Sequence, residues 1–232
     1  MDWLLLGSIA LAPVIIIFTM VFMLDRFERE PLGILILCFV FGIVIALPVV
    51  FAELGMQKAF NIQEENNPFL PTVLLAFVVV ALSEEGFKFL VLRLYAYPRK
   101  AFNEPYDGIM YALAISMGFA AIENVLYVQG GGLGVGILRM FTAVPAHAVF
   151  AHLMGYFVGL AKFNASGGKR VGLMAVGLFL AVLAHGLYDF FLMFDGAAFG
   201  IFSFVVLLAA LILSFKAIQS HQKNSPFRKA GQ

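Results

Sequence analysis

The chain has 232 residues, of which 62% are hydrophobic and only 12% are charged. Soluble domains are about 45–50% apolar and about 25% charged, so this chain has too few charged side chains to cover a water-facing surface. The composition excludes a soluble globule, a disordered chain and a disulfide-rich secreted module, and indicates an integral membrane protein. A formal net charge of +1 gives no support for nucleic-acid binding.

Seven stretches are apolar and long enough to cross a bilayer as helices, which requires about 20 residues each. We therefore expect an all-α, polytopic membrane helix bundle in one domain over residues 1–216, followed by a polar cytoplasmic tail over 217–232 that frays. The first stretch has no basic residue before its apolar run, so we interpret it as a retained helix. The expected spans are roughly 3–24, 32–52, 70–96, 107–128, 138–161, 171–194 and 199–216.

Basic residues in the connections predict the orientation, because lysine and arginine accumulate on the cytoplasmic side of a membrane. With seven spans, twelve of them fall on one side, and only Lys58 and Arg139 fall on the other. We therefore expect the N-terminus outside and the C-terminus in the cytoplasm. The expected connections are 25–31, 53–68, 97–106, the glycine-rich 129–136, 162–170 and a very short one near 195–196.

Four of the expected spans carry ionisable side chains, each of which costs about 2.5–3.5 kcal/mol to insert into a membrane. With the histidines neutral, four acidic residues and one lysine leave a surplus of three negative charges. Protonated carboxyls, a bound cation or a water-filled cavity would each relieve this surplus, and all three describe a functional site. The residues in question, in chain order, are Glu84, Glu85, Lys88, Glu123 (beside Asn124), His147, His152, His185 and Asp189.

Helical spacing predicts which of these side chains share a face. Glu84 and Lys88 are four residues apart in the favourable order, and Glu85 is three residues from Lys88. Because adjacent residues point about 100° apart, we expect one glutamate to pair with Lys88 and the other to face the cavity. His185 and Asp189 share a face, so the carboxylate can fix the orientation of the ring.

Carboxylates and histidines without a serine or cysteine partner suggest an activated water molecule. A carboxylate can take a proton from water while a histidine or asparagine stabilises the oxyanion. Alternatively, His147, His185 and Glu123 could hold a catalytic zinc ion with one open position. From the residues alone we infer a hydrolytic or ion-handling site. The alternatives are a proton- or cation-coupled transporter and a catalytically silent binding or immunity protein.

The ordered motifs resemble those of the PrsW family of intramembrane proteases, which is related to the CAAX-type endopeptidases. The resemblance covers roughly residues 25–189. One departure is Ala151, four positions after His147, where the resemblance leads us to expect glycine. His152 matches no motif, so we leave it outside the site. The matching stretches are DRFEREPL (25–32), Glu84-Glu85-x-x-Lys88, Asn103-Glu104-Pro105 before Asp107-Gly108, Phe119-x-x-x-Glu123-Asn124, His147 and His185-x-x-x-Asp189.

The resemblance implies a CAAX-protease-like, multi-pass protein of the bacterial inner membrane. It implies first-site cleavage of a single-span partner, an anti-sigma factor, in a stress response. Glu84 and Glu85 would supply the activating base, while the other catalytic residues would bind metal or stabilise the oxyanion. Zinc and a metal-free glutamate mechanism both stay open. The implied catalytic residues are Glu84, Glu85, Glu123, His147 and His185, and the supporting residues are Lys88, Asn124 and Asp189.

Overall fold

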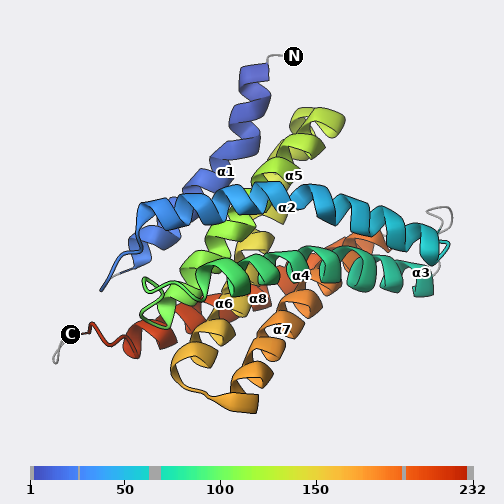
Figure 1. Cartoon of the computed structure of the whole chain (residues 1–232). Helices are drawn as coiled ribbons and strands as arrows, with labels where there is room; N and C mark the ends of the chain where they lie inside the picture. The colour runs from blue at the N-terminus through green and yellow to red at the C-terminus, as the bar shows by residue number, and fades with distance from the viewer. Residues whose placement is uncertain (1–2, 26, 63–68, 195–196, 229–232) are drawn as a thin grey trace.

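The chain folds into a bundle of helices (Figure 1). The computed structural model describes residues 3–25, 27–62, 69–194 and 197–228. Helices are the expected solution because a bilayer cannot satisfy backbone hydrogen bonds from outside the chain. The predicted all-α fold class is confirmed. The helices are α1 Trp3–Leu24, α2 Leu32–Ala59, α3 Phe69–Val73, α4 Leu82–Val91, α5 Tyr106–Phe141, α6 Ala143–Phe163, α7 Gly167–Met193 and α8 Ala197–Lys223.

Five stretches are long and apolar enough to cross a membrane, which confirms a polytopic membrane bundle. One of them, Tyr106–Phe163, is 58 residues long and comprises both α5 and α6. The segment Phe69–Ala96 is not among them; it combines α3 and α4 with two π-helical pieces, η1 Leu74–Ala81 and η2 Leu92–Ala96. The count of seven spans stays a prediction. The other four stretches are Gly7–Leu24, Leu32–Ala59, Gly167–Met193 and Gly200–Lys223.

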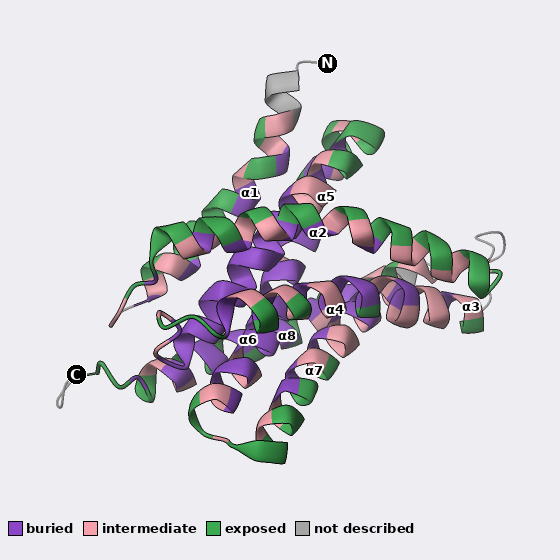
Figure 2. Ribbon diagram, in the orientation of Figure 1, coloured by how far each residue is buried: buried purple, intermediate pink, exposed green. Residues whose placement is uncertain are grey.

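Helices α5 and α6 form the centre of the bundle, where Figure 2 shows most of the buried residues. The first half of α5, from Tyr106 to Ala121, is buried on every side. Glycine permits this close packing: a Cβ on Gly118 would lie 1.9 Å from the carbonyl oxygen of Phe39 in α2. Such small-residue contacts bring helix backbones together in membranes, where no hydrophobic force drives association.

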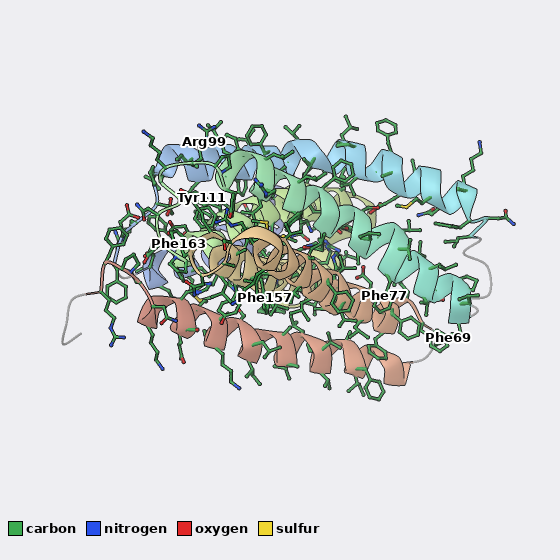
Figure 3. All side chains as sticks on the ribbon, turned by 60° about the horizontal axis from the view of Figure 1, so that its bottom comes forward. Phe69, Phe77, Arg99, Tyr111, Phe157 and Phe163 are labelled. Carbon is green, nitrogen blue, oxygen red and sulfur yellow. The ribbon has the colours of Figure 1, made fainter. Side chains whose placement is uncertain are left out.

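Large apolar side chains cover the outside of the bundle. Ile16, Phe51 and Leu94 are each more than 60% exposed. Figure 3 shows such side chains projecting outward along the helices, with Phe69 at one end of the bundle and Arg99 at the other. An apolar exterior of this kind is suited to contact with lipid acyl chains.

The glycine-rich stretch 129–136, predicted as a connection between spans, contains a break between two helical parts of α5. The structure places it within α5, and the following helix begins at Ala143. The break lies at Gly132, which has φ 74° and ψ −164°. A positive φ of this size is open to glycine at little steric cost.

The C-terminal boundary and the end of α2 differ from prediction. Helix α8 continues to Lys223, and Ala217, Ile218 and His221 on it are buried, so the predicted fraying from residue 217 is wrong for this part. Helix α2 runs to Ala59 instead of 52. Parts of four predicted features lie outside the described residues: the turn at 195–196, residue 26 of the first connection, residues 63–68 of the second, and residues 229–232 of the tail.

Candidate active site

The site begins on α4, a short α-helical piece between two π-helical segments. Glu84, Glu85 and Lys88 are all buried on this helix. Isolated π-helical turns are rare in proteins and occur frequently at functional sites. Here the two π-helical segments flank the short α-helix that carries the three charged residues.

Lys88 holds both glutamates, contrary to the prediction that only one could pair with it. Its Nζ lies 2.9 Å from Oε2 of Glu84 and 2.8 Å from Oε1 of Glu85. The lysine side chain is long and flexible, so its ammonium group reaches both carboxylates. The prediction considered only the 100° between adjacent residues and not this reach. Below Lys88, the ring of Phe119 lies 4.3 Å from Nζ and adds a cation–π contact.

His147 connects Lys88 to Glu123. Its Nδ1 lies 3.2 Å from Nζ of Lys88, and its Nε2 lies 2.7 Å from Oε2 of Glu123. An ammonium group can only donate, so Nδ1 accepts this hydrogen bond and Nε2 carries the ring proton that it donates to Glu123. Ser116 fixes the backbone here by donating to the carbonyl oxygen of His147, at 2.9 Å.

Arg139 is a member of this group that the sequence does not reveal. It lies 3.1 Å from Glu123, and its Nε donates to Oδ1 of Asn124 at 2.9 Å. Along a continuous helix, 15 residues would separate Arg139 from Asn124 by about 22 Å. The break at Gly132 folds the chain back and makes the contact. With Arg139 included, the surplus of negative charge falls from three to two.

Asn124, predicted as a supporting residue, does not touch the glutamates of α4 through any hydrogen bond that the structure gives it. Its Nδ2 donates to the carbonyl oxygen of Ala10 in α1 at 2.8 Å, and its Oδ1 accepts from Arg139. Asn124 therefore ties Arg139, and through it Glu123, to the first helix of the bundle.

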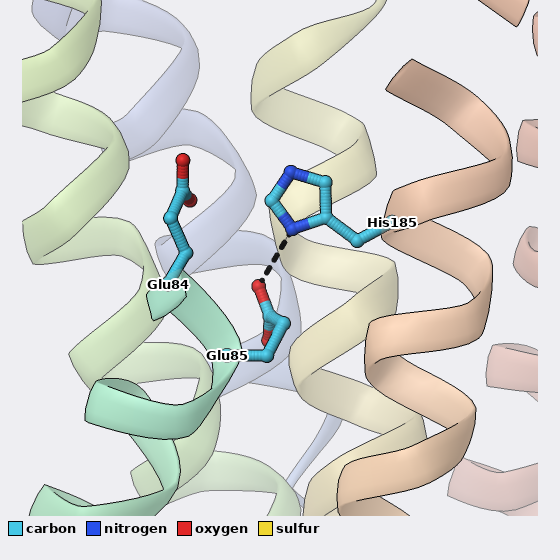
Figure 4. Close-up of side chains that lie close together, drawn as sticks. All are labelled: Glu84, Glu85 and His185. Carbon is cyan, nitrogen blue, oxygen red and sulfur yellow. Dashed lines mark hydrogen bonds and ion pairs between the residues drawn. The ribbon is translucent and has the colours of Figure 1, made fainter. Parts of the chain in front are cut away.

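His185 of α7 lies beside Glu84 and Glu85 (Figure 4). Its Nδ1 lies 3.1 Å from Oε1 of Glu85, and its Nε2 lies 3.2 Å from Oδ2 of Asp189. The predicted pairing of His185 with Asp189 is confirmed. Because ionised carboxylates only accept hydrogen bonds, satisfying both contacts requires one proton more than a neutral ring carries, or a cation. Phe150 stacks on the His185 ring with centroids 4.9 Å apart and restricts its motion.

The predicted catalytic residues thus form one connected group from four helices, since the His147 and His185 rings are only 5.6 Å apart. His152 lies outside this group, because its Nδ1 contacts the Ser214 hydroxyl of α8. Glu53 of α2, which sequence reasoning assigned to a connection, is close enough to interact electrostatically with Glu84, Glu123 and Lys88. The only feature of the sequence that could have pointed to Glu53 is its acidic charge near the end of an apolar run.

One set of side chains in this group has the chemistry of a metal site. One donor atom each from Glu84, Glu85 and His185 lies within 4.8 Å of the others. The set predicted from sequence, His147, His185 and Glu123, is not one of the groups found among the described residues. Asp189 accepts from Nε2 of His185, which leaves the Nδ1 lone pair for a ligand, an arrangement typical of metal-binding histidines.

A family model described as PrsW family intramembrane metalloprotease matches residues 30–214. The chain belongs to this family. It is 32% identical over 207 residues to the protein named Protease PrsW of Geobacillus kaustophilus, a match that covers 88% of each chain. Over 191 residues it is 35% identical to Protease PrsW of Clostridioides difficile, covering 81% of this chain and 79% of the relative. No solved structure matches the chain with significance.

Family membership identifies the chain as a PrsW-type intramembrane protease, a multi-pass membrane protein that acts on membrane protein substrates. The protein of the same name in Bacillus subtilis is 31% identical over 185 residues. The transporter alternative is set aside because the family model and these relatives are proteases.

Proposed function

We propose that this PrsW-type protease hydrolyses a peptide bond of a single-span membrane protein, an anti-sigma factor, as the first cleavage in a stress response. The observation that carries the proposal is the link between Glu85 and His185, which joins acid and imidazole groups from separate helices inside the bundle. Glu85 is fully buried and His185 is 4% exposed, so the chemistry is enclosed by protein. An enclosed polar site in an apolar bundle suits a substrate that arrives from the lipid phase.

In this proposal Glu84 and Glu85 supply the base. Glu84 contacts Lys88 through Oε2, which leaves Oε1 to accept a proton from water. The oxygen of that water adds to the scissile carbonyl carbon, the C–N bond breaks, and the proton passes to the departing amine. In this scheme Lys88 and His185, which both contact Glu85, stabilise the developing oxyanion. Such stabilisation is a large part of hydrolytic catalysis.

Glu123 and His147 act in this scheme by holding Lys88 in place. His147 accepts from Lys88 and donates to Glu123, so the chain Glu123–His147–Lys88 ends at the two catalytic carboxylates. The sequence-based alternative, in which Glu123 and His147 are themselves metal ligands, would require them to exchange these contacts for the ion.

The residues fit the metal that the family's description implies. Glu84, Glu85 and His185 would hold it, with Asp189 orienting the His185 ring. A metal ion bound there would lower the pKa of a water molecule and polarise the scissile carbonyl. Lys88 would then balance the charge of the two carboxylates and keep their oxygens in position.

We further propose that the N-terminus lies outside and the C-terminus in the cytoplasm of a bacterial inner membrane. Support comes from Figure 1, where one end of the bundle holds the connection that ends at Pro31, the one that ends at Pro105, and the end of α8. These segments belong to the basic side of the chain.

Co-expression with candidate single-span proteins tests the substrate. Wild type should release a fragment cut at or near the membrane segment of an anti-sigma factor, and Glu85→Ala should not. His152→Gln, a buried histidine outside the site, serves as the control and should cleave like wild type. If wild type cuts soluble or multi-span proteins while leaving every single-span anti-sigma factor intact, the substrate proposal is wrong although the protease assignment stands.

A further inference from the structure

A second group of acidic side chains lies at the end of the bundle away from the active site. The loop between α1 and α2 carries Glu28 and Glu30 to Asp107, the second residue of α5. One carboxylate oxygen from each of the three lies within 4.8 Å of the others. Along α5, Asp107 precedes Glu123 by 16 residues, or about 24 Å of helix, so this group is separate from the active site.

Two members of this group are buried and the third, Glu28, is half-buried. Their hydrogen bonds use only part of their oxygens. Glu30 is 2% exposed and Asp107 is 0% exposed. The Tyr111 hydroxyl donates to Oε2 of Glu30, and the backbone N–H groups of Asn103 and Glu104 donate to Oδ2 of Asp107 at 2.6 and 2.8 Å.

The remaining oxygens of the three carboxylates have no hydrogen-bond donor among the described residues. Three buried oxygens have no hydrogen-bond partner within the described part of the chain: Oε1 of Glu30, Oδ1 of Asp107 and Oε2 of Glu28. The carboxyl groups of Glu30 and Asp107 are also within hydrogen-bonding reach of each other. Two carboxyl groups approach this closely only when a proton or a cation lies between them.

Within the described part of the chain, two basic side chains near this group have other partners. Nζ of Lys162 donates to the carbonyl oxygens of Tyr97 and Arg99, at 2.6 and 3.3 Å. Arg29 lies over the ring of Phe22. None of the ion pairs within 4.0 Å among the described residues includes Glu28, Glu30 or Asp107.

We propose that Glu28, Glu30 and Asp107 bind a hard divalent cation of the Mg²⁺ or Ca²⁺ class at this end of the bundle. The donor set is made of oxygens alone, which such cations prefer, and it has no imidazole or thiolate to favour zinc. The cation fastens the α1–α2 loop to the start of α5. Figure 3 shows the labelled Tyr111, the partner of Glu30, toward this end, opposite the end that holds Phe69.

The site also lies where other segments of the chain meet. Ser225, just beyond α8, lies close to Glu104, and Gln222 of α8 donates to the carbonyl oxygen of Leu24. Occupation of the site is therefore expected to stabilise the contacts among both loops and the end of α8. This role is structural and independent of the substrate proposed above.

The test is cation binding to the full-length protein in detergent, in the Glu84→Gln/Glu85→Gln background. This background removes the carboxylates of the active-site donor set, so a metal bound there does not obscure the result. After treatment with chelator and buffer exchange, Mg²⁺, Ca²⁺ and Mn²⁺ are added separately. At saturation we expect at least one of them to raise Tm by about 5 °C or more. Bound Mn²⁺ is counted directly by electron paramagnetic resonance.

Variants locate the site. Asp107→Asn should abolish the Tm shift and the bound Mn²⁺, and Glu28→Gln, at the partly exposed edge, should weaken binding at least tenfold. Glu53→Gln, a glutamate of α2 outside this group, should leave binding unchanged. Absence of binding up to about 10 mM of every cation, above the range of weak calcium sites, would show that a shared proton joins Glu30 and Asp107 instead. Binding that survives both Asp107→Asn and Glu28→Gln would also overturn the proposal.

Discussion

Nδ1 of His185 lies 3.1 Å from Oε1 of Glu85, although the two residues are 100 positions apart in the chain. The same glutamate oxygen lies 2.8 Å from Lys88, so one buried carboxylate links α4 to α7 and to the only lysine of its own helix. Asp189 holds the opposite edge of the His185 ring. This relationship makes the active site depend on the packing of α7 against α4.

Replacing either partner of this contact should abolish proteolysis without unfolding the bundle. Glu85→Gln keeps the shape of the side chain but cannot take a proton from water, and His185→Gln removes the imidazole. Loss of a general base or of a stabilising group lowers rates by about 10²- to 10⁴-fold, so we expect a fall of at least about 100-fold. The measurement is cleavage of a single-span substrate by purified protein, with Tm recorded for each variant. Full activity in both variants would contradict the assignment.

Lys88→Met should lower stability as well as activity. Methionine has a similar length but leaves Glu84 and Glu85 buried without their shared counter-charge. Removing one partner from a buried ion pair costs about 3–5 kcal/mol, which corresponds to a drop in Tm of roughly 10 °C for a chain of this size.

The double variant Lys88→Met/Glu84→Gln provides the control for this interpretation. It removes one of the stranded charges, so its Tm should lie between those of Lys88→Met and wild type. A double variant less stable than Lys88→Met would show that the lysine acts through packing and not through charge.

Asn124→Ala tests the link from α1 to the site. It leaves the Ala10 carbonyl oxygen and Nε of Arg139 without their partner, at a cost of about 1–3 kcal/mol. Released from Asn124, Arg139 no longer holds Glu123 in one position, and we expect cleavage to fall about tenfold. Asn224→Ala, an exposed asparagine after α8, is the matched control. Equal cleavage by both variants would show that Asn124 does not position Arg139 and Glu123 for catalysis.

Much of the site was predictable because intramembrane charge is costly and therefore rare. Glu84, Glu85, His147 and His185 stand out in apolar runs, and the expected convergence of their spans is what the structure shows. The partner of each glutamate was not predictable in the same way. Cβ directions separate Glu84 from Glu85, but the reach of the Lys88 side chain decides the outcome.

Arg139 was beyond sequence reasoning for a different reason. Its contact with Glu123 depends on a reversal at Gly132, and a glycine-rich stretch permits many backbone paths without specifying one. The pairing of Asn124 with a backbone carbonyl in α1 is likewise a tertiary contact without local pattern. The length of α8 was underestimated because its last turns are polar in sequence. His221 in these turns is nevertheless buried against α6, where its Nε2 donates a hydrogen bond to the carbonyl oxygen of Tyr156.

Stability should fall with rising pH through the titration of Asp25 in the loop after α1. Burial, with the nearby charges of Asp107 and Glu28, raises the pKa of Asp25 from 3.8 to about 7. The folded chain therefore keeps this proton where the unfolded chain has lost it, and the stabilisation is complete below about pH 4 and lost as pH rises through 7. Thermal unfolding in chelator from pH 5 to 8 should show the decline, and Asp25→Asn should reduce it. An identical slope in the variant would exclude Asp25 as its source.

Gly118→Ala should disrupt the packing of α5 against α2. The added Cβ would lie 1.9 Å from the Phe39 carbonyl oxygen, and because that atom belongs to a helix backbone, the two helices must separate. Overpacking of this kind costs about 1–3 kcal/mol or more, so we expect Tm to drop by at least about 5 °C. Gly134→Ala, in the part of α5 beyond the break at Gly132, is the matched control, since nothing lies within 4 Å of its added Cβ. There the change should be neutral or slightly stabilising, because alanine favours helix over glycine. Similar Tm values for the two variants would mean that α2 and α5 are not held together by this glycine contact, and the position of Glu123 on α5 would then need another explanation.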